Sequence, residues 1–198
     1  MSTNNFIFFS IIVLGLAVYF FTKNNSSGVA TVTNDNSNIP QTFPNEGTLQ
    51  KNIKDAWLQT ANNICVNFSL FIDPKAILAT IEQESGARSL SENSSTIIGD
   101  NGHSIGMCQV SQTALYDINN YFGTSYVFTD LNDNTNNLTC GLLYLDMCLN
   151  IDQSKNNAYW LAYKRYNGGR DETDTSNNSM ATNYANQAYT KYQIYLQG

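Results

Sequence analysis

The stretch DPKAILATIEQESG, residues 73–86, decides the fold class of this chain. Asp73 and Pro74 are typical of the cap and first turn of a helix, and Gly86 is typical of a helix end. Upstream of this stretch, apolar residues recur at helical spacing, namely Leu49, Ile53, Trp57, Ile64 and Phe68. Two successive helices are therefore predicted, and the fold is expected to be mainly α.

Glu84 lies on the apolar face of the second predicted helix. Ile77, Ile81 and Glu84 occupy positions i, i+4 and i+7, which form one stripe along a helix. Glu82 points roughly 160° away from Glu84 and is expected to face solvent. A carboxyl group on an apolar face loses hydration, holds its proton more strongly and can deliver that proton to a leaving oxygen. Glu84 is therefore a candidate general acid, and the alternative is an exposed carboxylate at a helix end.

The charge of the chain excludes one large class of partner. The 198 residues carry a formal net charge of −6, with a sequence pI near 4.5. Nucleic-acid binding requires clustered Lys and Arg that neutralise phosphates, and the sequence contains no such cluster. No nucleic-acid partner is expected, and the length is sufficient for one core domain of ordinary size.

The N-terminus contains the apolar run FIFFSIIVLGLAVYFF, residues 6–21. This run is close to the lower length limit for a helix that spans a bilayer. A cleavable signal peptide is the competing interpretation, but no basic residues precede the run and no small-x-small cleavage site follows it. We therefore predict an uncleaved transmembrane anchor in residues 1–22, which contacts the membrane through residues 6–21.

Residues 23–46 are rich in Asn, Ser and Thr, with Pro40 and Pro44 near their end. Such a composition buries too little apolar surface to offset the entropy lost on ordering, so a flexible linker is predicted. An extended edge strand through residues 29–32 is the alternative. The folded domain is expected to occupy residues 47–198.

Three glycine-containing motifs follow the Glu84-Ser85 pair. They are Gly99-Asp100, Gly106-Met107-Cys108-Gln109-Val110 and Tyr166-Asn167-Gly168-Gly169. The turn sequence Asp100-Asn101-Gly102 comes directly after the apolar Ile97-Ile98-Gly99. This pattern predicts a small hairpin or a pair of loops between the two helical regions.

In this order the motifs resemble those of goose-type lysozymes and soluble lytic transglycosylases. Residues 137–145 and 183–186 are similar to the middle and last helices of that family, and the resemblance covers residues 64–198. It implies a lysozyme-like, mainly α-helical domain with a small β-hairpin or loop region at the cleft, here joined to an N-terminal transmembrane helix. It also implies that the partner is peptidoglycan, cut at the β-1,4 bond between N-acetylmuramic acid and N-acetylglucosamine.

The resemblance further implies roles for single residues. Glu84 would be the general acid and later the general base. Tyr166 would be a second catalytic residue and, together with Asn167, would hold Glu84 or the N-acetyl group of the substrate. The remaining residues implied to bind the glycan are Ser85, Gly106, Met107 and Gln109.

Asp100 matches one of two family aspartates that position a water molecule, but Ser111 stands where the second would be. An inverting hydrolase needs a base across the sugar from the acid, with about 6.5 to 9.5 Å between the two carboxyl groups. The missing carboxylate favours the lytic route, in which the substrate acetamido group attacks C1 and the 6-hydroxyl closes a 1,6-anhydro ring. Hydrolysis with Asp100 as the catalytic base stays open, as does a purely structural Asx-turn role for Asp100.

No cofactor is expected, and the single His103 with four dispersed cysteines gives no metal-ligand spacing. A thiol catalytic pair of His103 and Cys108 is rejected because no third orienting group is marked. The expected location is a membrane, anchored by the N-terminal helix, in a bacterial envelope or a phage virion. The alternative from another class is a non-catalytic glycan-binding or virion scaffold protein with a lysozyme-like fold.

The cysteines and tryptophans each have two interpretations. The cysteines could form two disulfides or remain reduced core thiols, and they are Cys65, Cys108, Cys140 and Cys148. A bond between Cys140 and Cys148 is excluded if they share one helix, because eight positions separate them by about 12 Å. Trp57 and Trp160 could be sugar platforms, but their helical spacing favours the core.

Overall fold

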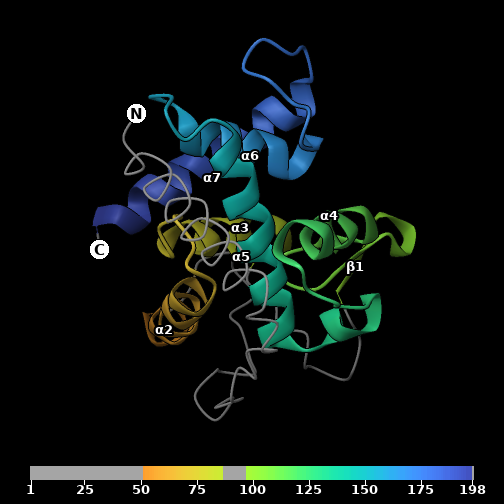
Figure 1. Cartoon of the computed structure of the whole chain (residues 1–198). Helices are drawn as coiled ribbons and strands as arrows, with labels where there is room; N and C mark the ends of the chain where they lie inside the picture. Colours follow the sequence, from red (N-terminus) through yellow and green to blue (C-terminus); the bar gives the residue numbers. More distant parts are fainter. Residues whose placement is uncertain (1–50, 87–96, 198) are drawn as a thin grey trace, which may run out of the picture. The chain divides into compact units, whose positions relative to one another are not determined.

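The computed structural model describes residues 51–86 and 97–197 (Figure 1). These residues form a mainly helical fold with one small antiparallel sheet, which confirms the mainly α class and the small β region that the sequence predicts. The elements are α2 (Lys51–Phe68), α3 (Lys75–Ser85), β1 (Ile98–Gly99), η3 (Asp100–Gly102), β2 (Ser104–Ile105), β3 (Val110–Ser111), α4 (Gln112–Phe122), η4 (Phe128–Asn132), α5 (Asn134–Ile151), α6 (Ala158–Gly168) and α7 (Ser179–Gln197).

The predicted membrane anchor in residues 6–21, the linker in residues 23–46 and the alternative edge strand all lie outside the described residues. Within residues 51–86 and 97–197, no helix is both long and apolar enough to cross a bilayer.

Helix α3 ends at Gly86 as the sequence predicts, and it begins one residue later than predicted, with Pro74 in place of Asp73 at the N-cap. Its first residue, Lys75, donates its backbone N–H to Asp73 Oδ1 at 2.8 Å. Pro74 precedes the first turn, with φ −58°. Proline has no N–H, but a backbone N–H at this position would have no partner within the helix, so no hydrogen bond is lost. Gly86 follows the last turn with φ 58° and ψ 32°. This left-handed conformation favours glycine, which explains why the helix ends directly after Ser85.

The predicted hairpin is confirmed and extends to three antiparallel strands in the order β1-β2-β3. Ile105 on the central strand pairs with Ile98 on one side and with Val110 on the other. Asn101 and Gly102, with φ 56° and 97°, form the turn between the first two strands. Asn and Gly are the residue types that adopt positive φ most readily, so the local sequence explains this turn.

Helix α5 is the central element of the described domain. It crosses the middle of the view in Figure 1 and packs against α2, α3, α4 and α6. Residues 137–149 are all buried. A helix buried around its whole circumference is apolar on every face, and each polar side chain on it requires a partner. Two such side chains, Asn137 and Asp146, bind the backbone of neighbouring segments.

Asp146 on α5 fixes the turn between α2 and α3. Its Oδ1 accepts the backbone N–H groups of Phe71 and Ile72, each at 2.9 Å, and its Oδ2 accepts from Asn150 Nδ2 at 2.8 Å. Only 2% of Asp146 is exposed. Burial raises the pKa of this carboxyl group, and the three hydrogen bonds oppose that rise. The orientation of α3, which carries Glu84, therefore depends on a side chain of α5.

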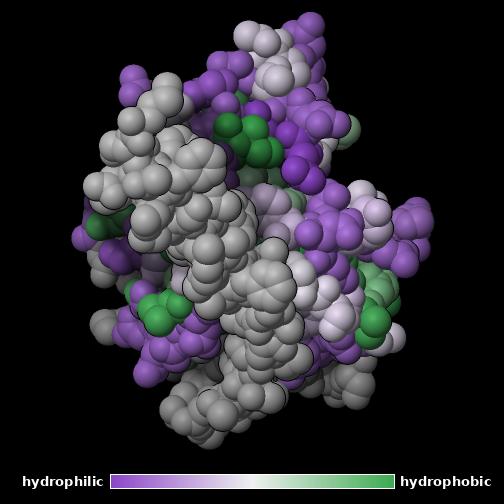
Figure 2. Space-filling view, in the orientation of Figure 1, coloured by the Kyte–Doolittle hydropathy of each residue, from purple (hydrophilic) through white to green (hydrophobic). Residues whose placement is uncertain are grey.

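The core interpretation is confirmed for Trp57, which is fully buried in α2. Trp160 is partly exposed and donates its Nε1–H to Asn186 Oδ1 at 2.9 Å. All four cysteines are free thiols, and Cys140 and Cys148 lie on the same helix, α5. On the face drawn in Figure 2, apolar side chains form small, separate patches among polar ones.

The Asp146 contacts predict a specific pattern of stability. Asp146→Ala should lower the free energy of unfolding by about 2 to 4 kcal/mol, because two backbone N–H groups lose their acceptor. Asp146→Asn retains an acceptor oxygen and should stay within about 1 kcal/mol of the parent at neutral pH. Urea unfolding followed by circular dichroism measures both values.

The same variants test the direction of the pKa shift. A carboxyl group whose pKa is raised on folding contributes most stability below its unfolded pKa of about 3.9 and loses that contribution as pH rises through its folded value. Asp146→Asn should remove this part of the pH dependence. An unchanged pH profile in this variant would contradict a raised pKa for Asp146.

Candidate active site

Glu84 lies in the last turn of α3 and is half-buried. Three buried groups from distant parts of the chain lie within range of its carboxylate: the Cys108 thiol, the Tyr166 hydroxyl in α6 and the Tyr184 hydroxyl in α7. Burial raises the pKa of each of these groups well above its usual value, and the charge of Glu84 raises each further. The fold thus brings the candidate acid together with these three groups, which we call the aromatic wall.

The Tyr184 hydroxyl lies beside the Glu84 carboxylate. It is buried and completes no hydrogen bond of regular geometry with the described residues. After burial, the largest cause of its raised pKa is the charge of Glu84, and a side-chain hydrogen bond to Glu84 contributes as well. The hydroxyl therefore lies near the carboxylate but is not aligned for a regular hydrogen bond. A small rotation that lets Tyr184 donate to Glu84 would satisfy an otherwise costly buried hydroxyl.

Tyr166 fixes the backbone at Cys108. Its hydroxyl donates to the Cys108 carbonyl at 2.7 Å, and the side chain is almost fully buried. Its ring lies nearly parallel to that of Tyr184, at 8° and 6.4 Å between centroids, and edge-on to that of Tyr144 at 5.4 Å. The single O–H of Tyr166 is therefore committed to the backbone and does not donate to Glu84.

Gly106 and Asn137 hold the segment between β2 and β3 against α5. Gly106 has φ 86°, and a Cβ atom at this position would collide with the Asn137 amide. Asn137 is fully buried, donates to the carbonyls of Ile105 and Leu131 at 2.9 and 3.1 Å, and accepts the N–H of Cys108 at 2.9 Å. Glycine is required here because both the φ value and the close approach exclude a side chain.

Gln109 organises the same segment with both ends of its amide. Its Nε2 donates to the carbonyls of Gly106 at 2.6 Å and Ile97 at 3.0 Å, and its Oε1 accepts from Ser104 Oγ at 2.9 Å. Its backbone has φ 46°, an uncommon value for a residue other than glycine. Gln109 therefore shapes the loop with its side chain, where the resemblance implies a sugar contact.

The other predicted site residues occupy different environments. Ser85 is buried, and its hydroxyl donates to the Ile81 carbonyl at 3.0 Å. Met107 is fully buried in the core, so only its backbone is available to a glycan. Asn167 is exposed in the last turn of α6. Asp100 begins η3, and its side chain lies outside the described part of the structure.

Ser111 is the N-cap of α4. Its Oγ accepts the backbone N–H of Ala114 at 3.0 Å, which satisfies one of the free donors at the helix start. A shallow, open pocket of about 520 Å³ lies here, lined by His103, Ser111, Gln112, Thr113 and Tyr116. Glu84 does not line this pocket, so the pocket and the candidate acid are separate features.

The prediction that Glu82 faces solvent is wrong. Glu82 is only partly exposed, and its Oε2 accepts the hydroxyl of Tyr195 in α7 at 2.5 Å. Helix α7 packs along α3 and covers the face of α3 that carries Glu82. The apolar pattern of α3 alone does not indicate that this face is covered. The two glutamates still differ in environment, because Glu82 contacts α7 near the end of the chain and Glu84 contacts the aromatic wall.

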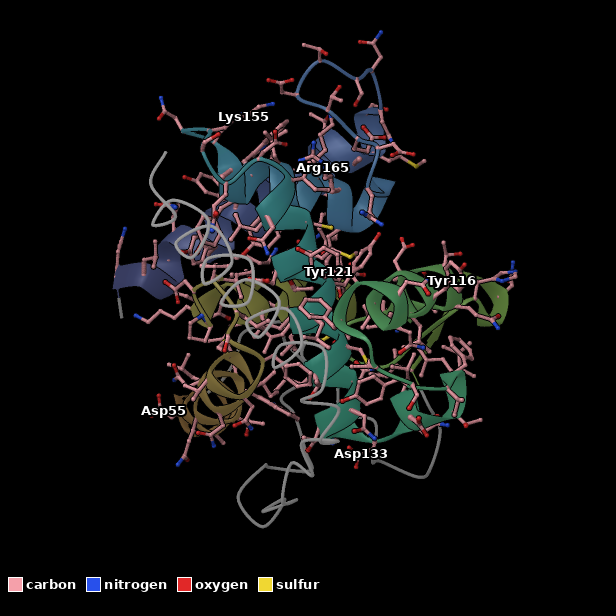
Figure 3. The ribbon with its side chains drawn as sticks, viewed as in Figure 1. Asp55, Tyr116, Tyr121, Asp133, Lys155 and Arg165 are labelled. Atoms are coloured by element: carbon pink, nitrogen blue, oxygen red, sulfur yellow. The ribbon has the colours of Figure 1, made fainter. Side chains whose placement is uncertain are left out.

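Buried cations fix the loop that follows α6. Lys164, of which 1% is exposed, donates its Nζ to the carbonyls of Thr173 at 2.7 Å and Ser176 at 3.1 Å. Arg165 is also buried and donates its Nε to the Arg170 carbonyl at 3.0 Å. Figure 3 shows Arg165 on α6. Since buried charges are costly without partners, these contacts hold the loop in one conformation.

Sequence reasoning misses two residues of this site. Asn137 is an amide within a helix whose residues 140–145 are apolar, and such a residue is a signal for a buried hydrogen-bonding role. Tyr184 belongs to residues 183–186, which resemble the last helix of the family, but its position beside Glu84 depends on how α7 packs against α3 and has no local signal.

Comparison with known proteins adds no assignment to this geometry. No family model, no curated protein and no solved structure matches the chain. Within the described residues, no group of three His, Cys, Asp or Glu side chains could hold a metal ion.

The contrast between two glycines tests how tightly the loop is built. Gly106→Ala combines an unfavourable φ of 86° with a collision against Asn137, so it should cost about 2 kcal/mol or more of the free energy of unfolding. Gly102→Ala has a similar φ of 97° but open space around the new Cβ, so it should cost only about 1 kcal/mol. Thermal melting of both variants gives the comparison, and equal losses would show that Asn137 moves aside.

Proposed function

We propose that this chain is a peptidoglycan muramidase that cleaves the bond between N-acetylmuramic acid and N-acetylglucosamine, with Glu84 as the general acid. The observation that carries the proposal is the placement of Glu84 at the end of α3, facing the buried groups of Cys108, Tyr166 and Tyr184. The order of the sequence motifs supports it as well. In this proposal no cofactor takes part, and residues 6–21 hold the enzyme to the membrane of a bacterial envelope or a phage virion.

The proposed reaction has two steps. Glu84 donates its proton to the glycosidic oxygen while the acetamido oxygen of the muramoyl residue attacks C1, which releases the leaving sugar and forms an oxazolinium ion. The 6-hydroxyl of the same residue then attacks C1, the bond to the acetamido oxygen breaks, and the Glu84 carboxylate takes up the hydroxyl proton. Between the steps Glu84 is an anion, and a hydrogen bond from Tyr184 would stabilise that charge.

The lytic route is preferred because of Ser111. Its hydroxyl is used as the N-cap of α4, and a hydroxyl is too weak a base near neutral pH to activate water. A route in which the substrate supplies its own nucleophile needs only one acid and base residue. Hydrolysis would require Asp100 to serve as the second carboxylate, at a suitable distance from Glu84.

The proposal predicts different effects for two glutamates of the same helix. Glu84→Gln cannot donate a proton and should lower turnover of isolated peptidoglycan by at least about a hundredfold. Glu82→Gln is the matched control, because it can still accept the hydrogen bond of Tyr195 and should retain nearly full turnover. The measurement is the release of soluble muropeptides, with circular dichroism to show that both variants fold. Equal turnover by Glu84→Gln and the parent would refute the assignment.

The products of the reaction identify the route. The lytic route consumes no water, so mass spectrometry should find disaccharide-peptides that are one water lighter than hydrolysed ones. Asp100→Asn should then lower turnover by less than about tenfold, since no second carboxylate takes part. Reducing-end products together with a large loss in Asp100→Asn would instead identify a hydrolase in which Asp100 is the base.

A further inference from the structure

Arg170 lies close to the aromatic wall of the candidate site. It is the first residue after Gly169, which caps α6. Its positive charge and the negative charge of Asp117 on α4 both act on the pKa of Tyr144, which burial raises most strongly. The Tyr144 ring in turn contacts that of Tyr166 edge-on at 5.4 Å. Arg170 also follows Tyr166, the residue that fixes the Cys108 backbone, by four positions, so the chain keeps their Cα atoms within about 14 Å of each other.

The backbone of Arg170 is fixed by hydrogen bonds to buried groups. Arg165, of which 4% is exposed, donates its Nε to the Arg170 carbonyl at 3.0 Å and forms an ion pair with Asp152. The Gly169 N–H donates to the Arg165 carbonyl at 2.8 Å. These contacts preorganise the start of the loop, so Arg170 projects from a fixed base.

The guanidinium of Arg170 has N–H donors that are available to a ligand. Its Nη1 lies 3.7 Å from Asp117 Oδ1, which is an ion pair but too long for a hydrogen bond. Within residues 51–86 and 97–197 the guanidinium makes no hydrogen bond, and 41% of the side chain is exposed. A guanidinium carries five N–H donors in a planar fork that matches the two oxygens of a carboxylate. Asp117 thus orients Arg170 without occupying its donors.

A local cation matters in this chain because Lys and Arg number 10 against 16 Asp and Glu. An anionic substrate is repelled by the net charge and gains from a single cation placed beside the site. Peptidoglycan strands carry stem peptides whose free carboxylates provide such an anion.

We propose that Arg170 binds a carboxylate of the stem peptide attached to the muramoyl residue, and so directs the enzyme toward glycan that carries peptides. This inference rests on the proposed muramidase function. In it, the carboxylate replaces Asp117 as the nearest anion to the guanidinium and accepts two of its N–H groups. Asp117 competes with the peptide, so its removal favours binding.

The test measures binding to the full chain carrying Glu84→Gln, which prevents turnover. The probes are a muropeptide disaccharide with its tetrapeptide, the same disaccharide with the peptide carboxylates amidated, and the disaccharide without peptide. Calorimetry should show that the first probe binds at least about tenfold more tightly than the other two. Adding Arg170→Gln should abolish this difference and leave the affinity for the other two probes unchanged.

Two further variants separate recognition from folding. Lys155→Gln is the matched control, since the Lys155 side chain is also 41% exposed but pairs with Asp152, and it should retain the preference. Asp117→Asn should strengthen binding of the carboxylate probe. A weakening of all probes by Arg170→Gln, a weakening by Asp117→Asn, or equal binding of the three probes to the parent would overturn the inference. Turnover of peptide-free glycan by the wild-type chain tests the muramidase function separately.

Discussion

The burial of residues 137–149 of helix α5 is the constraint on which the rest of the structure depends. Because residues 137–149 have no exposed face, every neighbouring element must supply an apolar surface or a polar partner. Asn137 forms hydrogen bonds with the backbone of the loop between β2 and β3. Asp146 accepts hydrogen bonds from the backbone of the turn between α2 and α3. One helix thus sets the positions of both segments that carry the candidate site, the end of α3 and the Cys108 loop.

The candidate site follows from that arrangement together with the packing of α6 and α7. Tyr166 ties α6 to the Cys108 carbonyl, and Tyr184 brings α7 to Glu84. The result is a carboxylate at the border between water and a wall of buried aromatic rings. Such a border suits a group that must exchange its proton twice in one reaction cycle, because the acid and the anion both need stabilisation.

Local signals predicted the elements, and long-range hydrogen bonds determined the details. The ends of α3 were predictable to within one residue because Asp73, Pro74 and Gly86 each act on the adjacent helical turn. The orientation of Glu82 was not, because Tyr195 reaches it from the last helix. Gln109 was expected to face the substrate, but its amide satisfies neighbouring carbonyls, a choice that depends on how the loop closes. Periodicity describes one helix at a time and contains no information about such contacts.

The most direct test of the account is a crystal structure of the Glu84→Gln chain with a bound peptidoglycan tetrasaccharide. The account predicts that the scissile glycosidic oxygen lies within hydrogen-bond distance of the substituted side chain, about 2.6 to 3.2 Å. It also predicts that the adjacent muramoyl ring lies near Tyr184 and the Cys108 loop. A glycan bound only in the pocket of His103 and Tyr116, with the position of Glu84 unoccupied, would contradict the central claim.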